Sequence, residues 1–162
     1  MFVNGRMYSA VFSGVSISVV QDLFEINGAA GKVTYLCGFE LSQTGTADFG
    51  DAQEEGVGLR VRSGQTSSGS GGGSAPTAVP VNVTDAAFGG NVEINNTTQA
   101  TSGTIVIHAQ WSWNPRMPYI WEPPPNKWIP LTGSRRATIE IDTTPADAIA
   151  LCRATVWLFE VG

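Results

Sequence analysis

The chain has 162 residues, of which 42% are hydrophobic and only 14% are charged, and its formal net charge is −5. The charged share is well below the usual ~25%, and the longest basic run is Arg135-Arg136. Binding along a nucleic-acid backbone needs a basic stripe, so we expect no nucleic-acid partner. No segment approaches the ~18 consecutive apolar residues of a membrane-spanning helix, so we expect no membrane partner.

The first third of the chain alternates apolar and polar residues, which is typical of β-strands. Its candidate strands are residues 8–20, 22–26, 32–44 and 57–63. Because residues 1–20 alternate instead of forming an unbroken apolar run, we interpret them as a strand and not as a secretory signal. Gly38, inside the third candidate strand, indicates a bulge or a close backbone approach.

The two cysteines, Cys37 and Cys152, both lie in apolar runs. We expect synthesis in a cytoplasm, where thiols stay reduced. We therefore interpret them as buried core thiols. A disulfide between them would require their two strands to lie side by side.

Residues 62–81, RSGQTSSGSGGGSAPTAVPV, have the composition of a flexible linker. A linker here would leave an N-terminal piece of four strands, which would be a marginal fold with exposed edges. We therefore expect residues 1–162 to form one domain. Residues 62–81 would then be an extended Gly/Ser-rich loop or arm within it, able to contact a partner.

The remaining candidate strands are residues 91–95, 104–113, 118–123, 127–131, 137–142 and 151–161. Helix is scarce, with short turns expected only at residues 83–90 and 143–148. The sequence predicts an all-β fold: a single antiparallel β-sandwich with long ordered loops or arms and little helix. We favour a jelly-roll-like arrangement. Another sandwich topology is the alternative, because period-two alternation does not encode strand order.

No residue pattern indicates catalysis. The acidic segment 48–55, DFGDAQEE, could attract Ca²⁺ but lacks EF-hand spacing, so we interpret it as a solvated loop. His108 is the only histidine, and we interpret it as structural. We therefore predict a protein that is not an enzyme and has no cofactor and no metal site.

The segment 111–128 is unusually aromatic: it contains Trp111, Trp113, Tyr119, Trp121 and Trp128. Trp111 and Trp113 share one strand face because side chains repeat every two residues. The cluster could belong to the core, to a protein interface or to a carbohydrate site. Residues 123–125 are three prolines, for which we expect an extended polyproline II contact arm.

Several segments, taken in order, resemble a group of tailed-bacteriophage virion proteins. The matching segments are MYSAVFSGVSIS (7–18), QDLFEI (21–26), FELSQTGTADFGDAQEE (39–55), residues 62–81, DAAFGG (85–90), EINNTTQATSGT (93–104) and PADAIALCRATVWLFEV (145–161). The resemblance spans nearly the whole chain, and segment 111–128 matches it least well.

The resemblance implies a small all-β capsid decoration, or cement, protein. Such a protein would be made in the bacterial host cytoplasm and would sit on the capsid surface of the virion. Its partners would be the major capsid protein and further copies of itself, as a homotrimer. The alternatives are a tail, neck or head-fibre structural protein, and a carbohydrate-binding β-sandwich module that contacts the host surface.

On this hypothesis, partner or self contacts fall in the loop and in the aromatic segment. The candidate contact residues are Gly64, Ser67, Ser70, Pro76, Trp111, Trp113, Tyr119, Trp121, Pro124 and Trp128.

Overall fold

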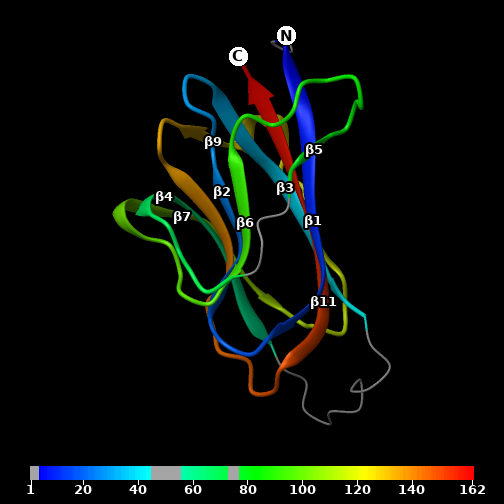
Figure 1. Cartoon of the computed structure of the whole chain (residues 1–162). Coiled ribbons are helices and arrows are strands. Elements are labelled where there is room, and N and C mark those ends of the chain that lie inside the picture. The colour runs from blue at the N-terminus through cyan, green and yellow to red at the C-terminus, as the bar shows by residue number, and fades with distance from the viewer. Residues whose placement is uncertain (1–3, 45–55, 73–76) are drawn as a thin grey trace.

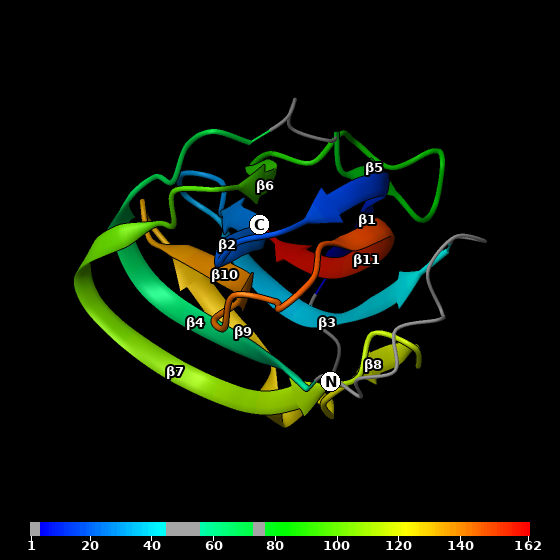
Figure 2. The same cartoon turned by 90° about the horizontal axis from the view of Figure 1, so that it is seen from below.

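The computed structural model describes residues 4–44, 56–72 and 77–162, which form two antiparallel β-sheets packed face to face (Figures 1 and 2). Sheet 1 has the strand order β5-β1-β11-β3-β8, with β9 also paired to β3, and sheet 2 has the order β6-β2-β10-β4-β7. The elements are β1 (Gly5–Ile17), β2 (Gln21–Asn27), β3 (Val33–Gln43), β4 (Val57–Ser67), β5 (Val79–Pro80), β6 (Asn91–Asn96), β7 (Thr101–Trp113), β8 (Tyr119–Trp121), the 3-10 turn Pro125–Lys127, β9 (Ile129–Thr132), β10 (Arg136–Ile141) and β11 (Ile149–Val161).

The strand pairing is nested, which identifies the topology. β1 pairs with β11, β2 with β10, β3 with both β8 and β9, and β4 with β7. The chain is therefore one long hairpin that folds over on itself, closed by the pairs β11–β3 and β10–β4. This is the strand order of a jelly roll. The predicted all-β sandwich and its jelly-roll-like arrangement are confirmed.

The core lies between the sheets and consists of the inward-facing residue of each alternating pair. Phe12 of β1 meets Phe24 of β2 across the sandwich, with ring centroids 5.1 Å apart. Ile139 of β10 and Leu158 of β11 are fully buried. Each such side chain contributes about 1.5–3 kcal/mol through removal from water, so this interior holds the two sheets together.

Gly38 and the cysteines behave as predicted. Trp157 pairs with Gly38 and Leu158 with Leu36, so Cys37 is the extra residue of a β-bulge. A side chain at Gly38 would also lie 2.5 Å from the carbonyl oxygen of Trp121, so both expectations for this glycine are confirmed. Cys37 and Cys152 are free and buried, and burial raises the pKa of each thiol to about 12.

The loop regions differ from the prediction in detail. β4 continues through Ser67, so the first residues of segment 62–81 are strand, and β5 near its end was not predicted. Residues 83–90 and 143–148 form bends and turns without helix. Pro124 is extended (φ −61°, ψ 156°), but Pro125 begins a 3-10 turn. The expected polyproline II run over residues 123–125 therefore ends one residue early, because Lys127 N–H bonds back to the Pro124 carbonyl.

Candidate functional site

The outer face of sheet 1 is open to solvent and is here called the open face. Strand register places its outward side chains in rows across β1, β11, β3 and β8. One row is Val11, Thr155, Glu40 and Ile120, because each faces the next across a strand pair. The two apolar ends of this row, Val11 and Ile120, are each 59% exposed. Exposed apolar side chains that gather on one face can mark a surface that binds another protein.

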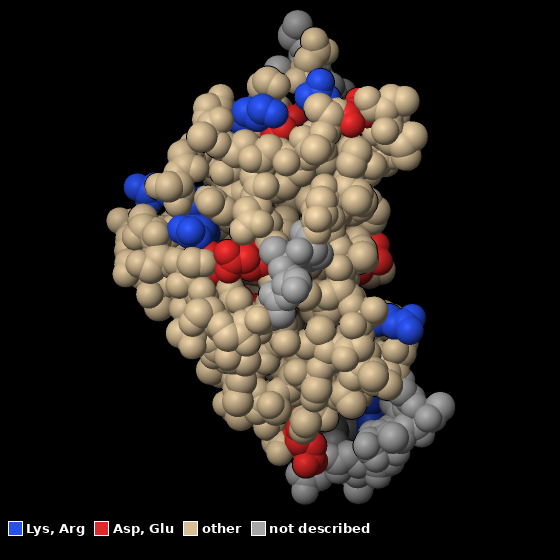
Figure 3. Space-filling view, in the orientation of Figure 1, with Lys and Arg blue, Asp and Glu red and all other residues tan. Residues whose placement is uncertain are grey.

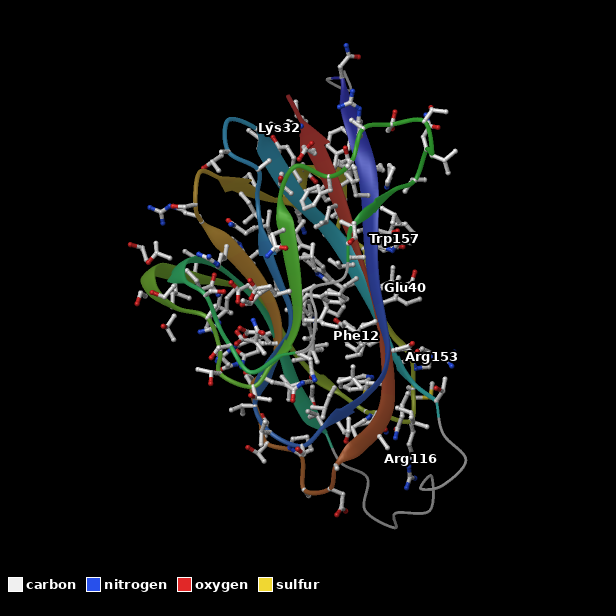
Figure 4. The ribbon with its side chains drawn as sticks, in the orientation of Figure 1. Phe12, Lys32, Glu40, Arg116, Arg153 and Trp157 are labelled. Atoms are coloured by element: carbon white, nitrogen blue, oxygen red, sulfur yellow. The ribbon has the colours of Figure 1, made fainter. Side chains whose placement is uncertain are left out.

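A shallow groove of about 550 Å³ runs over this row and the next one. The second row is Ser13, Arg153 and Ser42. Figure 4 shows Glu40, Arg153 and Trp157 projecting from the same side of sheet 1, while Phe12 points between the sheets. The groove is therefore a depression in the outer surface of sheet 1.

Glu40 and Arg153 are the charged groups of the groove. Neither forms an ion pair within the part of the chain that the structure describes. Figure 3, in the orientation of Figure 1, shows few Lys, Arg, Asp and Glu residues on a mostly uncharged surface, and some of them lie beside a group of opposite charge. A partner could therefore meet one free anion and one free cation on an otherwise neutral face.

The open face continues into an aromatic region toward the chain termini. The rings of Tyr35, Trp128 and Phe159 lie 5.7–6.4 Å apart. Phe159 also lies directly over Gly5, where any side chain would collide with its ring. These contacts fix three large half-buried side chains in place, so a partner would not have to order them on binding.

The outer face of sheet 2, here called the covered face, is different. Three of its acidic side chains, Asp22, Glu25 and Glu140, are buried. Glu140 accepts hydrogen bonds from Arg60 Nε at 2.8 Å and from Arg62 Nη2 at 2.7 Å. Buried carboxylates are tolerated only when they are paired and hydrogen-bonded, and this one is held between two guanidinium groups.

Segments 68–70 and 96–100 lie over the covered face and are tied to its acids. Glu25 accepts bonds from Ser68 Oγ at 2.8 Å and from the backbone N–H of Gly69 at 2.9 Å, and it pairs with Arg136. Asp22 accepts a 2.7 Å bond from the backbone N–H of Ala100. The Gly/Ser-rich segment is thus fastened at its start to sheet 2 by charge-assisted hydrogen bonds.

Asp22 is the most perturbed of these acids. Burial raises its pKa to about 8, and the bond from Ala100 N–H acts in the opposite direction. Glu140 and Glu25 raise the pKa further by repulsion, while Arg62 lowers it. This raised pKa predicts that Asp22 carries a proton at neutral pH, which would leave the covered face with one fewer negative charge than its sequence indicates.

The predicted aromatic residues separate into three groups. Trp113 is 2% exposed and belongs to the core, where its indole N–H donates to the Met117 carbonyl at 2.8 Å. Trp111, Tyr119 and Trp121 pack against the core, and all three rings contact Phe39. Trp128 lies in the aromatic region described above. The pair that motivated the carbohydrate hypothesis, Trp111 and Trp113, is thus turned toward the core.

The remaining candidates are spread along the chain. Gly64 is buried within β4, Ser67 is exposed at the end of β4, and Ser70 forms a β-bridge with Thr98. Pro124 is exposed beside the 3-10 turn. Pro76 and the acidic segment 48–55 lie outside the described residues. The structure does not bring the loop candidates and the aromatic candidates together into one site.

Other candidate chemistry is limited. His108 lies on the exposed strand β7, its Nε2 is 2.7 Å from Ser63 Oγ, and burial lowers its pKa. Within residues 4–44, 56–72 and 77–162, no group of three His, Cys, Asp or Glu residues is arranged to hold a metal ion. The described chain also has no helix long and apolar enough to cross a membrane.

Sequence reasoning missed the residues of the open face, notably Val11, Glu40, Ile120 and Arg153. The alternation along each strand assigns each of these residues to one side of its own strand. It does not tell which side a second layer covers, and no local signal in the sequence separates the two outer faces.

Comparisons with known proteins give little. No family model matches this sequence, and no curated protein matches it. Among solved structures, the chain is similar to the viral particle of infectious bursal disease virus, with 18% identity over 97% of this chain and 31% of that one, at a TM-score of 0.29. It is also similar to a mutant VP2 protein of the same virus, with 16% identity over 98% and 40% of the two chains, at a TM-score of 0.22. The chain thus spans less than half of either protein, and at these TM-scores the fold assignment stands on the strand pairing alone.

Proposed function

We propose that this protein is a virion structural protein that binds the outside of an assembled tailed-bacteriophage capsid and stabilises it, as a decoration protein. The observation that carries the proposal is the open face of sheet 1, a weakly charged surface with Val11 and Ile120 exposed at the two ends of one row of side chains. The sequence resemblance to tailed-phage virion proteins supports the choice of partner. The fold alone would not, because jelly rolls serve many functions.

The physical basis is preferential binding. A protein that binds the assembled lattice and not the free subunit shifts the equilibrium toward the lattice by mass action. Such a clamp needs a rigid surface, which the bonded sheet 1 supplies, and it needs no reactive group. Glu40 and Arg153 would set the register on the capsid, while Val11 and Ile120 would supply the apolar burial.

The first experiment measures copy number and position in intact virions by cryo-electron microscopy. Copies distributed over the capsid lattice, with sheet 1 against the shell, would support the proposal. A single ring at one vertex would favour the alternative of a neck or tail component. Density on the capsid with sheet 2 against the shell would overturn the assignment of the open face.

The second experiment tests the surface with matched variants. Ile120→Asp and Val11→Asp place an unpaired carboxylate in the proposed contact, so capsid affinity should fall about tenfold or more. Val19→Asp is the control, because Val19 is 40% exposed in the bend between β1 and β2, outside both the groove and β7. Equal loss of binding in all three variants, or in none, would contradict the proposal.

A further inference from the structure

The described sheets have four outer edges, and three of them are short or interrupted. β5 has two residues and contains Pro80, whose nitrogen cannot donate to a further strand. β8 and β9 lie along β3 as two short pieces on either side of a proline-rich turn, and β9 contains Pro130. β6 has six residues and carries Glu93. Such features keep strand edges from pairing with other chains.

The fourth edge, β7, has none of these features. It runs for 13 residues, and within the described chain only β4 pairs with it (Figure 2). Its sequence, TSGTIVIHAQWSW, contains no Pro, Lys, Arg, Asp or Glu. Ile105, Val106 and Ile107 are exposed by 38%, 47% and 52%. Consecutive residues point to opposite faces of a strand, so this stretch is exposed on both faces.

We propose that β7 pairs antiparallel with β7 of a second copy of this chain. Ser102 and Gly103 have positive φ angles, so the segment available for pairing begins at Thr104, and we take it to His108. Within it, Val106 and Ile107 pair regularly with β4, and the β4–β7 pairing is irregular between Gly103 and Val106 and between Ile107 and Ala109. A two-fold axis through Val106 matches this segment with itself. Ile105 then faces Ile107 of the second copy, and Thr104 faces His108. The two five-stranded sheets would become one continuous sheet.

The choice of a second copy as occupant follows from the sequence of the edge. In this register residue 106 faces itself, so a charge there would lie opposite an identical charge, which is destabilising. β7 carries no charged residue, and its β-branched run Thr104–Ile107 gives favourable cross-strand pairs under the two-fold. A self-complementary contact of this kind closes as a dimer. The resemblance to decoration proteins implied a trimer. A dimer and a trimer differ in mass, so a mass measurement distinguishes them.

This inference concerns self-association and does not depend on what the open face binds. Light scattering and sedimentation equilibrium of the full chain should show a species of twice the 17.1 kDa chain mass that dissociates on dilution. In the wild-type protein, hydrogen exchange at residues 104–108 should slow as concentration rises. A monomer at every concentration, a trimer, or exchange at β7 that is independent of concentration would overturn the proposal.

The register is tested by charge complementation at Val106. Val106→Lys and Val106→Glu each place two like charges on the axis, so each variant alone should be monomeric. Mixing the two variants should restore the dimer, because Lys then faces Glu. Ile120→Lys is the control, since it adds the same charge at an exposed apolar residue of sheet 1 and should leave the dimer intact. Failure of the folded variants to associate on mixing, checked by circular dichroism for each, would overturn the two-fold register.

Discussion

The two outer faces of this sandwich reverse the usual relation between polarity and exposure. Asp22, Glu25 and Glu140 on sheet 2 are buried, whereas Val11 and Ile120 on sheet 1 are more than half exposed. The inner faces are both apolar, so the difference arises from what lies outside each sheet. On sheet 2 the chain itself returns as segments 68–70 and 96–100 and bonds to the acids. On sheet 1 no described segment crosses the groove between Val11 and Ile120.

The comparison shows that a sheet face covered by its own chain and a sheet face that binds another protein need different residues. A covering segment of the same chain can be held by charged groups. Because it is tethered, its effective concentration at the sheet is high, and this offsets the cost of removing the charges from water. A face that binds a separate protein gains most from apolar surface with a few unpaired charges. Each prediction below changes one group on one of the two faces.

The largest effect is expected at Glu140. Glu140→Gln leaves Arg60 and Arg62 without their shared carboxylate, and breaking a buried pair costs about 3–5 kcal/mol. We expect the lower end, about 3 kcal/mol, because the Arg60 side chain keeps 23% exposure. Urea unfolding measures the loss. Glu40→Gln on the open face is the matched control, with an expected change below about 0.5 kcal/mol. Equal losses in the two variants would remove the distinction between the faces.

Asp22 gives a pH-dependent effect of intermediate size. Its pKa is raised from 3.8 to about 8, chiefly by burial, so the folded protein keeps a proton that the unfolded chain releases above pH 4. Stability should therefore fall from about pH 4 to about pH 8 and then level off, with a slope of up to about 1.4 kcal/mol per pH unit.

Asp22→Asn removes this titration. At pH 8 the variant should be more stable than the wild type by about 1–2 kcal/mol, less than the full linkage because the amide accepts a weaker bond from Ala100 N–H. The difference should change sign toward pH 4, where the wild type alone regains the stability that this titration removes. The measurement is urea unfolding at four pH values. Parallel curves for the two proteins would show that Asp22 is ionised in the folded state.

The sequence predicted the strands well because strand formation is a local property here. Ten of the eleven strands coincide with alternating apolar segments, for example residues 137–142 for β10 and 151–161 for β11. β5 was missed because a strand of two residues is too short to show an alternation of apolar and polar residues. The jelly-roll arrangement was an expectation from the number and spacing of strands, and only the observed pairing of β1 with β11 and β4 with β7 decided it.

The faces could not be predicted, because covering a sheet is a long-range event. In QDLFEI the acids alternate with apolar residues, which favours a solvent-exposed position for Asp22 and Glu25. Their burial depends on Ser68, Gly69 and Ala100, more than forty residues away along the chain. The aromatic segment was undecided for the same reason. Register places Trp113 inside and leaves Trp128 beside Tyr35 and Phe159, and register is set by partner strands.

The smallest effect on stability is expected at Arg153, which tests the comparison of the two faces from the open face of sheet 1. Arg153 is exposed on the open face without an ion pair in the described chain, so Arg153→Gln should change the free energy of unfolding by less than about 0.5 kcal/mol. Arg136→Gln is its counterpart on the covered face, where Arg136 pairs with the buried Glu25 and donates to the Thr66 carbonyl. Its loss should cost about 2 kcal/mol or more, because Glu25 would stay buried with one fewer partner. Urea unfolding of the two variants side by side measures both. A cost at Arg153 as large as that at Arg136 would mean that sheet 1 uses its outer charges to hold the fold together, and Arg153 would then no longer be a residue kept for a partner.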